Sequence, residues 1–297
     1  LSRFPHKDLA PGFAMDLTTH DSDGKAWDFN SMEMRERARR RVREDRPMFI
    51  VGSPMCKEFS SWQALNAARH SRDASVANRE RTRAVLHLTF MAELYHMQVE
   101  AGRFFLHEHP DGATSWSEDA IAEIMQMPGV ERVRGDQCRY GQRARRGPLA
   151  GRPVMKPTGF MSNSPWILKR LGLKCKGAPG ECDDGGPHAQ CSGAVARDAQ
   201  VYPKKLCHAI AMGMRDQLRE MGIIRNGIHG QQCATLVDEP VFSVVADLPG
   251  YSVKYRDDLT GQILRDDLVE EARQKEMCYF SEKKVWRKIS RPEAKSM

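Results

Sequence analysis

One cysteine in this chain stands where a nucleophile would be exposed. Cys56 lies in segment 52–62, directly after the short apolar run 48–51, which predicts a buried strand that ends in a loop. A cysteine on such a loop lies near strand-end dipoles and helix N-termini that favour the thiolate, so it is a candidate nucleophile. Taken alone, the same residue also fits a buried structural thiol.

A second group of chemically active residues forms a cysteine-rich stretch. The glycine-rich loop 174–193 holds four soft or borderline metal ligands in the pattern C-x6-C-x5-H-x2-C: Cys175, Cys182, His188 and Cys191. Thiolates and imidazole are the ligands of tetrahedral structural zinc, which would stabilise a loop that otherwise lacks a core. Free surface thiols are the alternative, and Cys207 or His208 could replace one ligand.

A third candidate is the triplet of His107, Glu108 and His109. In an extended segment alternate side chains share a face, so the two histidines could bind one metal ion together with a carboxylate from elsewhere. Such a site would belong to a metal-dependent nuclease. Histidines that are hydrogen-bonded at a strand end, without a metal, are the alternative.

The elements around these residues alternate between strands and helices. The patterns predict strand 12–15, helix 32–45, strand 48–51, helix 79–100, strand 103–107, helix 117–125, strand 130–133, strand 158–161, helix 165–171 and helix 204–221. This order predicts an α/β fold with a Rossmann-like parallel sheet covered by helices, a cysteine-rich loop and an irregular C-terminal extension. Cys56 and Glu108 follow strands, at the edge where such sheets bind ligands.

The loop after strand 48–51 resembles the nucleophile motif of the DNA cytosine-5 methyltransferases. Five landmarks of that motif stand here: Gly52, Pro54, Cys56, Phe59 and Ser60. In that family a long helix and a strand follow the motif, and the strand leads into a glutamate. Helix 79–100, strand 103–107 and Glu108 stand in the same order. The sequence departs from the family pattern at Met55, Lys57, His109 and Pro110.

The resemblance implies covalent chemistry on a flipped-out cytosine. The Cys56 thiolate would add to ring carbon six, and Glu108 would hold the protonated ring nitrogen. Arg143 and Arg145, in a segment similar to a later signature of the family, would assist the base or the backbone.

The resemblance also implies a methyl donor, S-adenosylmethionine. Asp16, after strand 12–15, matches an acidic position of the cofactor domain, and Pro54 is the second candidate contact. The glycine-rich first-strand motif that binds the donor has no counterpart upstream. The Rossmann-like sheet is therefore expected to be incomplete at its N-terminus.

Composition and charge narrow the classes of partner. The chain has 46 lysines and arginines against 39 acidic residues, and its net charge of +7 fits a polyanionic partner as well as plain solubility. DNA is the partner that the resemblance implies, and RNA is the open alternative. No apolar run reaches the ~18 residues of a membrane span and no secretory leader opens the sequence, so an intracellular protein, nuclear or cytoplasmic, is expected. The sequence specifies no oligomeric state.

The tail 255–295 resembles the lead-in of Copia-type retrotransposon reverse transcriptases. The residues that carry this likeness are Ala272, Glu276, Lys283, Lys284, Val285, Trp286 and Ile289. The expected organisation is a methyltransferase-like domain at 1–230, followed at 231–297 by a linker and the start of a reverse-transcriptase-like region. The leading hypothesis is a retroelement-associated cytosine-5 DNA methyltransferase-like protein. The alternative is a non-catalytic nucleic-acid-binding or scaffold segment of a retrotransposon polyprotein.

Overall fold

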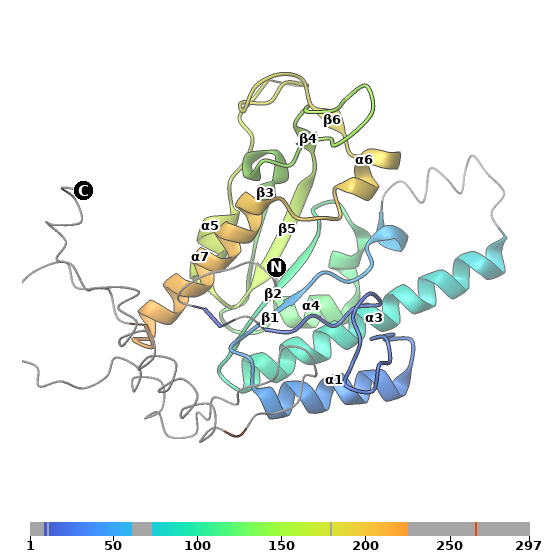
Figure 1. Ribbon diagram of the computed structural model, residues 1–297, viewed down its shortest axis with the longest axis vertical. Helices are drawn as coiled ribbons and strands as arrows, with labels where there is room; N and C mark the ends of the chain where they lie inside the picture. The colour runs from blue at the N-terminus through green and yellow to red at the C-terminus, as the bar shows by residue number, and fades with distance from the viewer. Residues whose placement is uncertain (1–8, 11, 61–72, 179, 225–264, 266–297) are drawn as a thin grey trace, which may run out of the picture. The chain divides into compact units, whose positions relative to one another are not determined.

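The computed structural model describes residues 9–10, 12–60, 73–178, 180–224 and Arg265 (Figure 1). The chain divides into two compact units, of which one comprises Leu1–Thr19 with Trp27–His229 and the other His20–Ala26 with Gly230–Met297. In the second unit, segment 20–26 forms a tight turn in which Asp21 N donates to Lys25 O over 2.8 Å. The tail residues that resemble a reverse transcriptase lie outside the described residues.

The central sheet of the first unit has four strands in the order β1-β2-β5-β3. The strands are β1 (Phe49–Gly52), β2 (Phe104–Pro110), β3 (Glu131–Asp136) and β5 (Pro157–Ser162). β1 pairs in parallel with β2, and β5 lies between β2 and β3 and is antiparallel to both. β1, β2 and β3 therefore run in one direction, and the sheet is mixed.

The antiparallel strand β5 corrects the prediction of a parallel sheet. A parallel strand needs a crossover, usually a helix, that returns the chain to the edge where the previous strand began. Between β3 and β5 the chain forms only the 3₁₀ helix η3 (Gln137–Tyr140) and the short strand β4 (Val154–Met155). Without a longer helix the chain re-enters the sheet at the edge where β3 ends, with Asp136 opposite Pro157.

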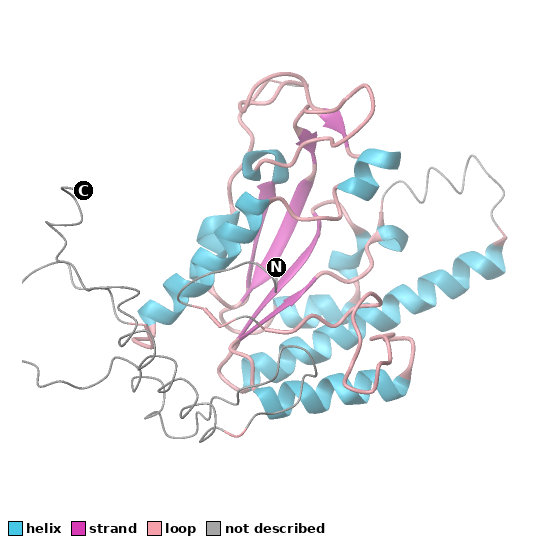
Figure 2. Ribbon diagram, in the orientation of Figure 1, coloured by secondary structure: helices cyan, strands magenta, loops and turns pink. Residues whose placement is uncertain are grey.

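Helices cover both faces of the sheet (Figure 2). The remaining elements are α1 (Met32–Asp45), η1 (Lys57–Phe59), α3 (Ala74–Glu100), η2 (Thr114–Ser117), α4 (Asp119–Met125), α5 (Pro165–Leu171), β6 (Ala189–Gln190), α6 (Gly193–Asp198) and α7 (Lys204–Glu220). Neighbouring side chains of β2 point to opposite faces, so Phe105 packs with α3 and α4 whereas Leu106 packs with α5 and α7. None of the described helices is both long and apolar enough to cross a membrane.

α1 carries most of its arginine charge in ion pairs. Ser31 begins the helix, and its side chain accepts a hydrogen bond from Met34 N. Arg39 pairs with Glu93 of α3, and Arg41 pairs with an acid of its own helix. The buried side of α1 packs on α3. Arg39 therefore connects α1 to α3, whereas Arg41 pairs within its own helix.

Residues 12–15 do not form the strand predicted for them. The Phe13 ring contacts α1, because the Arg41 guanidinium carbon lies 3.7 Å from the ring centroid. Asp16, predicted to contact the methyl donor, closes a turn in which its carboxylate accepts from Thr18 N over 2.7 Å. The side-chain hydrogen bond from Thr18 lowers the pKa of Asp16. The segment is thus fixed by local turn bonds and by α1, and it does not pair with the sheet.

Candidate functional site

Cys56 lies on the loop that leaves the carboxyl end of β1. β1 ends at Gly52, and η1 begins directly after Cys56. A Cβ atom at position 52 would lie 2.0 Å from the Tyr95 hydroxyl oxygen, so glycine lets the strand end close to α3. Phe59 is fully buried in the core that includes α3 and α4. The loop that carries the thiol is therefore anchored at both ends.

His109 holds the middle of this loop. Burial lowers the pKa of His109, so the ring is neutral and carries one N–H. The Pro54 carbonyl can only accept, so Nε2 donates to it over 3.0 Å, and Nδ1 accepts from the Ser115 hydroxyl over 2.6 Å. His109 therefore supports the Cys56 loop. Pro54, predicted to contact a cofactor, uses its carbonyl oxygen for this internal bond.

The carboxylate of Glu108 is buried among donors from three other segments. The Tyr202 hydroxyl donates to Oε2 over 3.0 Å, and Gln137 Nε2 donates to Oε1 over 3.4 Å. The Lys156 ammonium lies 3.7 Å from Oε1, and the Glu108 side chain is only 8% exposed. Ser53, in the loop after β1, is hydrogen-bonded to the same Tyr202 hydroxyl. These contacts hold the carboxylate in one orientation beside the loop of the nucleophile.

Cys56 and Glu108 act on each other electrostatically. Burial, and then the negative charge of Glu108, raises the pKa of Cys56, whereas the Lys156 ammonium lowers it. In the free protein the sulfur is therefore a thiol at neutral pH. A bound group that neutralised the Glu108 carboxylate would remove one raising effect and favour the thiolate.

The two arginines predicted to assist at this site are engaged elsewhere or exposed. Arg143 forms an ion pair with Asp184 over 2.8 Å, within the cysteine-rich loop. Arg145 is exposed. No hydrogen bond or ion pair recorded for the described residues joins either of them to Glu108. The cation beside this carboxylate is Lys156, which the sequence reasoning did not single out.

The triplet at 107–109 does not converge on one point. His107 and His109 lie on one face of β2, with ring centroids 5.0 Å apart, whereas Glu108 points to the opposite face. His107 Nδ1 is hydrogen-bonded to the Tyr95 hydroxyl over 2.9 Å, and burial lowers its pKa well below the ordinary value. Both rings are therefore neutral and buried; both nitrogens of His109 are hydrogen-bonded inside the protein, whereas His107 is bonded through Nδ1 and its Nε2 has no hydrogen-bond partner among the described residues. The geometry does not favour the predicted nuclease site.

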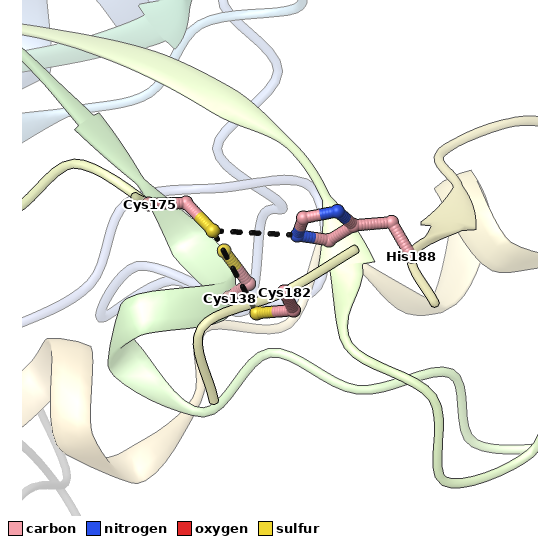
Figure 3. A group of neighbouring side chains, drawn as sticks. All are labelled: Cys138, Cys175, Cys182 and His188. Atoms are coloured by element: carbon pink, nitrogen blue, oxygen red, sulfur yellow. Dashed lines mark hydrogen bonds between the residues drawn. The ribbon is translucent and has the colours of Figure 1, made fainter. Parts of the chain in front are cut away.

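Four metal-ligating side chains meet beyond the end of β3, as Figure 3 shows. They are Cys138, Cys175, Cys182 and His188, and their ligand atoms all lie within 4.8 Å of one another. Cys175 Sγ is 3.8 Å from Cys182 Sγ and 3.7 Å from His188 Nε2. In a zinc tetrahedron with Zn–S bonds of about 2.3 Å, two sulfurs lie about 3.8 Å apart. This cluster, called the Cys138 cluster below, could therefore hold a metal ion.

The cluster contains three of the four ligands predicted from the sequence. Cys138, which belongs to η3 outside the cysteine-rich loop, stands in the place predicted for Cys191. Directly after His188 the chain forms β6, which pairs with β4. This pairing places Cys191 in a small apolar cluster, away from the other ligands. Cys207 and His208, the predicted substitutes, lie on α7 outside the group.

Hydrogen bonds shape the ligand loops. Gly186, at φ +76°, closes a hairpin in which Cys182 N donates to its carbonyl oxygen over 2.9 Å. Asp184 N donates to the Cys182 sulfur over 3.4 Å. Cys175 N donates to Asp136 Oδ2 over 2.8 Å, which ties the loop to the end of β3. Such contacts fix the ligand atoms before a metal binds.

Comparison with known proteins adds no relative. No protein-family model, no curated protein and no solved structure matches this chain. The structure brings the Cys56 loop to Glu108 through Ser53 and Tyr202, and it keeps Asp16, Arg143 and Arg145 in other contacts or in solvent.

Proposed function

We propose that this chain is a cytosine-5 DNA methyltransferase-like protein with Cys56 as its nucleophile. The observation that carries the proposal is the position of the Cys56 loop, which follows β1, beside the buried Glu108 carboxylate of the adjacent parallel strand β2: Ser53 of this loop and Glu108 are both hydrogen-bonded to the Tyr202 hydroxyl. Ligands of open α/β sheets bind at this carboxyl-terminal edge. A Rossmann-like identity of the sheet belongs to the same proposal. The retroelement context depends on the resemblance of the tail alone.

Cys56 and Glu108 supply the groups that covalent addition to cytosine requires. The Cys56 thiol gives its proton to Glu108 as the sulfur forms a bond to ring carbon six. The ring electrons shift toward N3, which takes up this proton from Glu108 and stays paired with the carboxylate. Ring carbon five is then nucleophilic and takes up a proton from water. Loss of the original carbon-five hydrogen and release of the thiolate restore the ring. Because a stacked base cannot reach a buried carboxylate, the base must be flipped out or single-stranded.

The described residues do not fit the implied site for S-adenosylmethionine. Segment 12–15 forms no strand, and the Asp16 carboxylate is bound within its own turn. When bound, the donor would supply a methyl group to ring carbon five. The proposed chemistry of this chain's own residues is the reversible addition of Cys56.

Hydrogen exchange at ring carbon five tests this addition without any methyl donor. Wild-type protein should release tritium from DNA that contains [5-³H]cytosine, and Cys56→Ser should reduce the release by at least about 10³-fold. Met55→Leu, at the exposed neighbouring position, is the matched control and should retain release. Wild-type protein that releases no tritium would contradict the catalytic proposal. DNA binding without release would favour the non-catalytic nucleic-acid-binding segment.

We infer further that the Cys138 cluster binds zinc in a structural role. Three thiols and one imidazole, all from the protein, are a ligand set of closed structural zinc sites. Burial, and then the neighbouring Cys182 and Cys175, raises the pKa of Cys138 in the metal-free protein. Binding must therefore displace a proton, so zinc affinity should fall as the pH is lowered.

Metal analysis of purified protein distinguishes the ligand set of the structure from that of the sequence. Wild-type protein should contain one zinc per chain, and Cys138→Ser and Cys182→Ser should lose it. Cys191→Ser should retain zinc, because Cys191 lies outside the cluster. Zinc retained by Cys138→Ser and lost by Cys191→Ser would support the sequence-derived set instead.

A further inference from the structure

We propose that the metal centre positions two partners of Glu108. Metal bonds to Cys138 and His188 hold Gln137 and Lys156 against the carboxylate, so both are positioning residues for the nucleophile site. This inference rests on the zinc proposal and gives the metal a role beyond the stability of its own loop. Three structural links carry it.

The first link runs through η3. Cys138 directly follows Gln137, so a metal bond to the Cys138 thiol fixes the backbone of η3. Gln137 N donates to the Lys156 carbonyl oxygen over 3.1 Å. Gln137 Nε2 donates to Glu108 Oε1 over 3.4 Å and to Thr158 Oγ1 over 3.0 Å. A direct donor to the carboxylate is therefore the neighbour of a metal ligand.

The second link runs through the short parallel pair of β4 and β6. Ala189 follows His188, and its N–H donates to the Pro153 carbonyl oxygen over 2.7 Å. β4 leads directly into Lys156, whose ammonium lies 3.7 Å from Glu108 Oε1. A metal bond to His188 thus fixes the strand that presents the lysine.

The third link joins the ligand loop to the end of β3. Cys175 N donates to Asp136 Oδ2 over 2.8 Å, and Asp136 N donates to Leu173 O over 2.8 Å. Asp136 directly precedes Gln137. The segment around Gln137 is therefore held on one side by the ligand loop and on the other by the Cys138 thiol.

Few apolar contacts stabilise this region. The buried apolar cluster at the β4–β6 pair consists of Ala144, Val154 and Ala189, with Leu149, Cys191 and Val195 partly buried against it, whereas η3 is anchored by Tyr140 in the α5–α7 core. The small side chains at the β4–β6 pair bury little apolar area, so the ion would be the main cross-link between the ligand hairpin and β4, in addition to the hydrogen bond from Lys156 Nζ to the Ala199 carbonyl oxygen over 3.1 Å. Loss of the ion should loosen Gln137 and Lys156. Tyr202 comes from the segment before α7, packs with the α5–α7 core, and should keep its bond to Glu108.

The pKa of Cys56 reports on this change. After burial, which is the largest effect, the charge of Glu108 raises this pKa and the charge of Lys156 lowers it. Other titratable groups near the loop are Cys191, His109 and Tyr202, together with Lys57 and Glu58 of η1 and Glu80 and Arg81 of α3. When Lys156 moves away, the Glu108 charge is less compensated, so the pKa of Cys56 should rise.

The test measures the alkylation rate of Cys56 by iodoacetamide against pH, resolved by peptide mass spectrometry, in the full chain with zinc and after chelation. In wild type, chelation should move the midpoint of the pH profile upward and slow alkylation several-fold at neutral pH. In Lys156→Met the midpoint should already be high, and chelation should shift it by less than half the wild-type amount. Lys156→Arg should respond as wild type does. Glu181→Ala, an exposed non-ligand on the same hairpin, is the matched control.

Three results would overturn the inference. The first is a midpoint of the wild-type alkylation profile that chelation leaves unchanged. The second is a chelation-induced midpoint shift in Lys156→Met that is half the wild-type shift or more. The third is a general loss of amide protection in α3 after chelation, measured by hydrogen exchange. The last would make the ion a determinant of the whole fold instead of the Glu108 partners. Alkylation requires neither DNA nor a methyl donor, so its outcome is independent of the methyltransferase proposal. Failure of the zinc proposal is detected separately, by metal analysis before chelation.

Discussion

Glu108 has two opposite effects on the chemistry proposed for Cys56. Its charge, second to burial, raises the pKa of the thiol and keeps the sulfur protonated in the free protein. The same charge is what a protonated ring nitrogen would pair with, and that pairing would remove the raising effect. The thiolate should therefore form when a substrate binds. A thiol that is protonated at rest is also protected from oxidation.

Replacement of Glu108 by glutamine should separate these effects. Without the carboxylate charge the pKa of Cys56 should fall, so the midpoint of its alkylation profile should move to lower pH. The same variant should release tritium from ring carbon five about 10²–10⁴-fold more slowly, because the amide cannot serve as the acid–base group. Peptide-resolved alkylation and the release assay measure the two effects. The control is Glu93→Gln, on the exposed surface of α3, which should change neither the alkylation midpoint nor the tritium release. A higher alkylation midpoint in Glu108→Gln than in wild type would contradict the effect assigned to the carboxylate charge.

At this scale the sequence identifies residues by their position after a strand but does not reveal their partners. Cys56 follows β1 as predicted, whereas Glu108, predicted to follow its strand, lies within β2, which continues to Pro110. Both lie near the carboxyl ends of adjacent strands, so their approach is predictable. Lys156, Gln137 and Tyr202 reach Glu108 from segments far away along the chain, and no local pattern marks them. The same reason explains why a pattern confined to the cysteine-rich loop could not include Cys138.

At the scale of elements, the periodicity of apolar residues predicts which segments are helices and strands better than it predicts the direction of a strand within the sheet. The helices at 32–45, 165–171 and 204–221 are confirmed as α1, α5 and α7 within one residue. Segment 158–161 is a strand as predicted, but its direction depends on the preceding connection, which has no long helix. The apolar run at 12–15 is too short to distinguish a strand from a segment that packs on a helix.

The packing of α5 against α7 depends on Gly213. A Cβ atom there would lie 2.6 Å from Ile167 Cα and 3.1 Å from Trp166 O, backbone atoms that cannot easily move. Gly213→Ala should therefore lower the free energy of unfolding by about 1–3 kcal/mol, despite the better helix propensity of alanine. Urea unfolding measures this change. Gly172→Ala would meet only Leu168 O at 3.7 Å and should stay within about 0.5 kcal/mol of wild type; equal losses would refute the argument.

At the scale of the first unit, the direction of three strands brings the two groups of side chains to one edge. β1, β2 and β3 are parallel to one another, so their carboxyl ends lie on the same side of the sheet. The nucleophile loop follows β1, Glu108 lies near the end of β2, and η3 with Cys138 follows β3. The antiparallel β5 strengthens this arrangement, because the connection that enters it presents Lys156 at the same edge.

Two buried histidines should make the stability of this unit depend on pH. Burial lowers the pKa of His107 well below its ordinary value and also lowers that of His109. The unfolded chain therefore binds more protons than the folded protein once the pH falls below the unfolded-state pKa of about 6.5. The stabilisation is fully present above that pH. It should decline below it by up to about 1.4 kcal/mol per pH unit for each histidine.

His107→Phe isolates one share of this dependence, because phenylalanine fills the buried site without titrating. The variant loses the bond to the Tyr95 hydroxyl and should be less stable at every pH, but its free energy of unfolding should fall less steeply between about pH 6.5 and 5. Urea unfolding of both proteins at a series of pH values measures how steeply the free energy of unfolding falls with pH in each. With identical zinc conditions, the protons exchanged by the metal ligands contribute equally to both proteins, so they cancel in the difference. Equal slopes would mean that the buried His107 ring takes up a proton in the folded state, against the desolvation that its position in the core imposes.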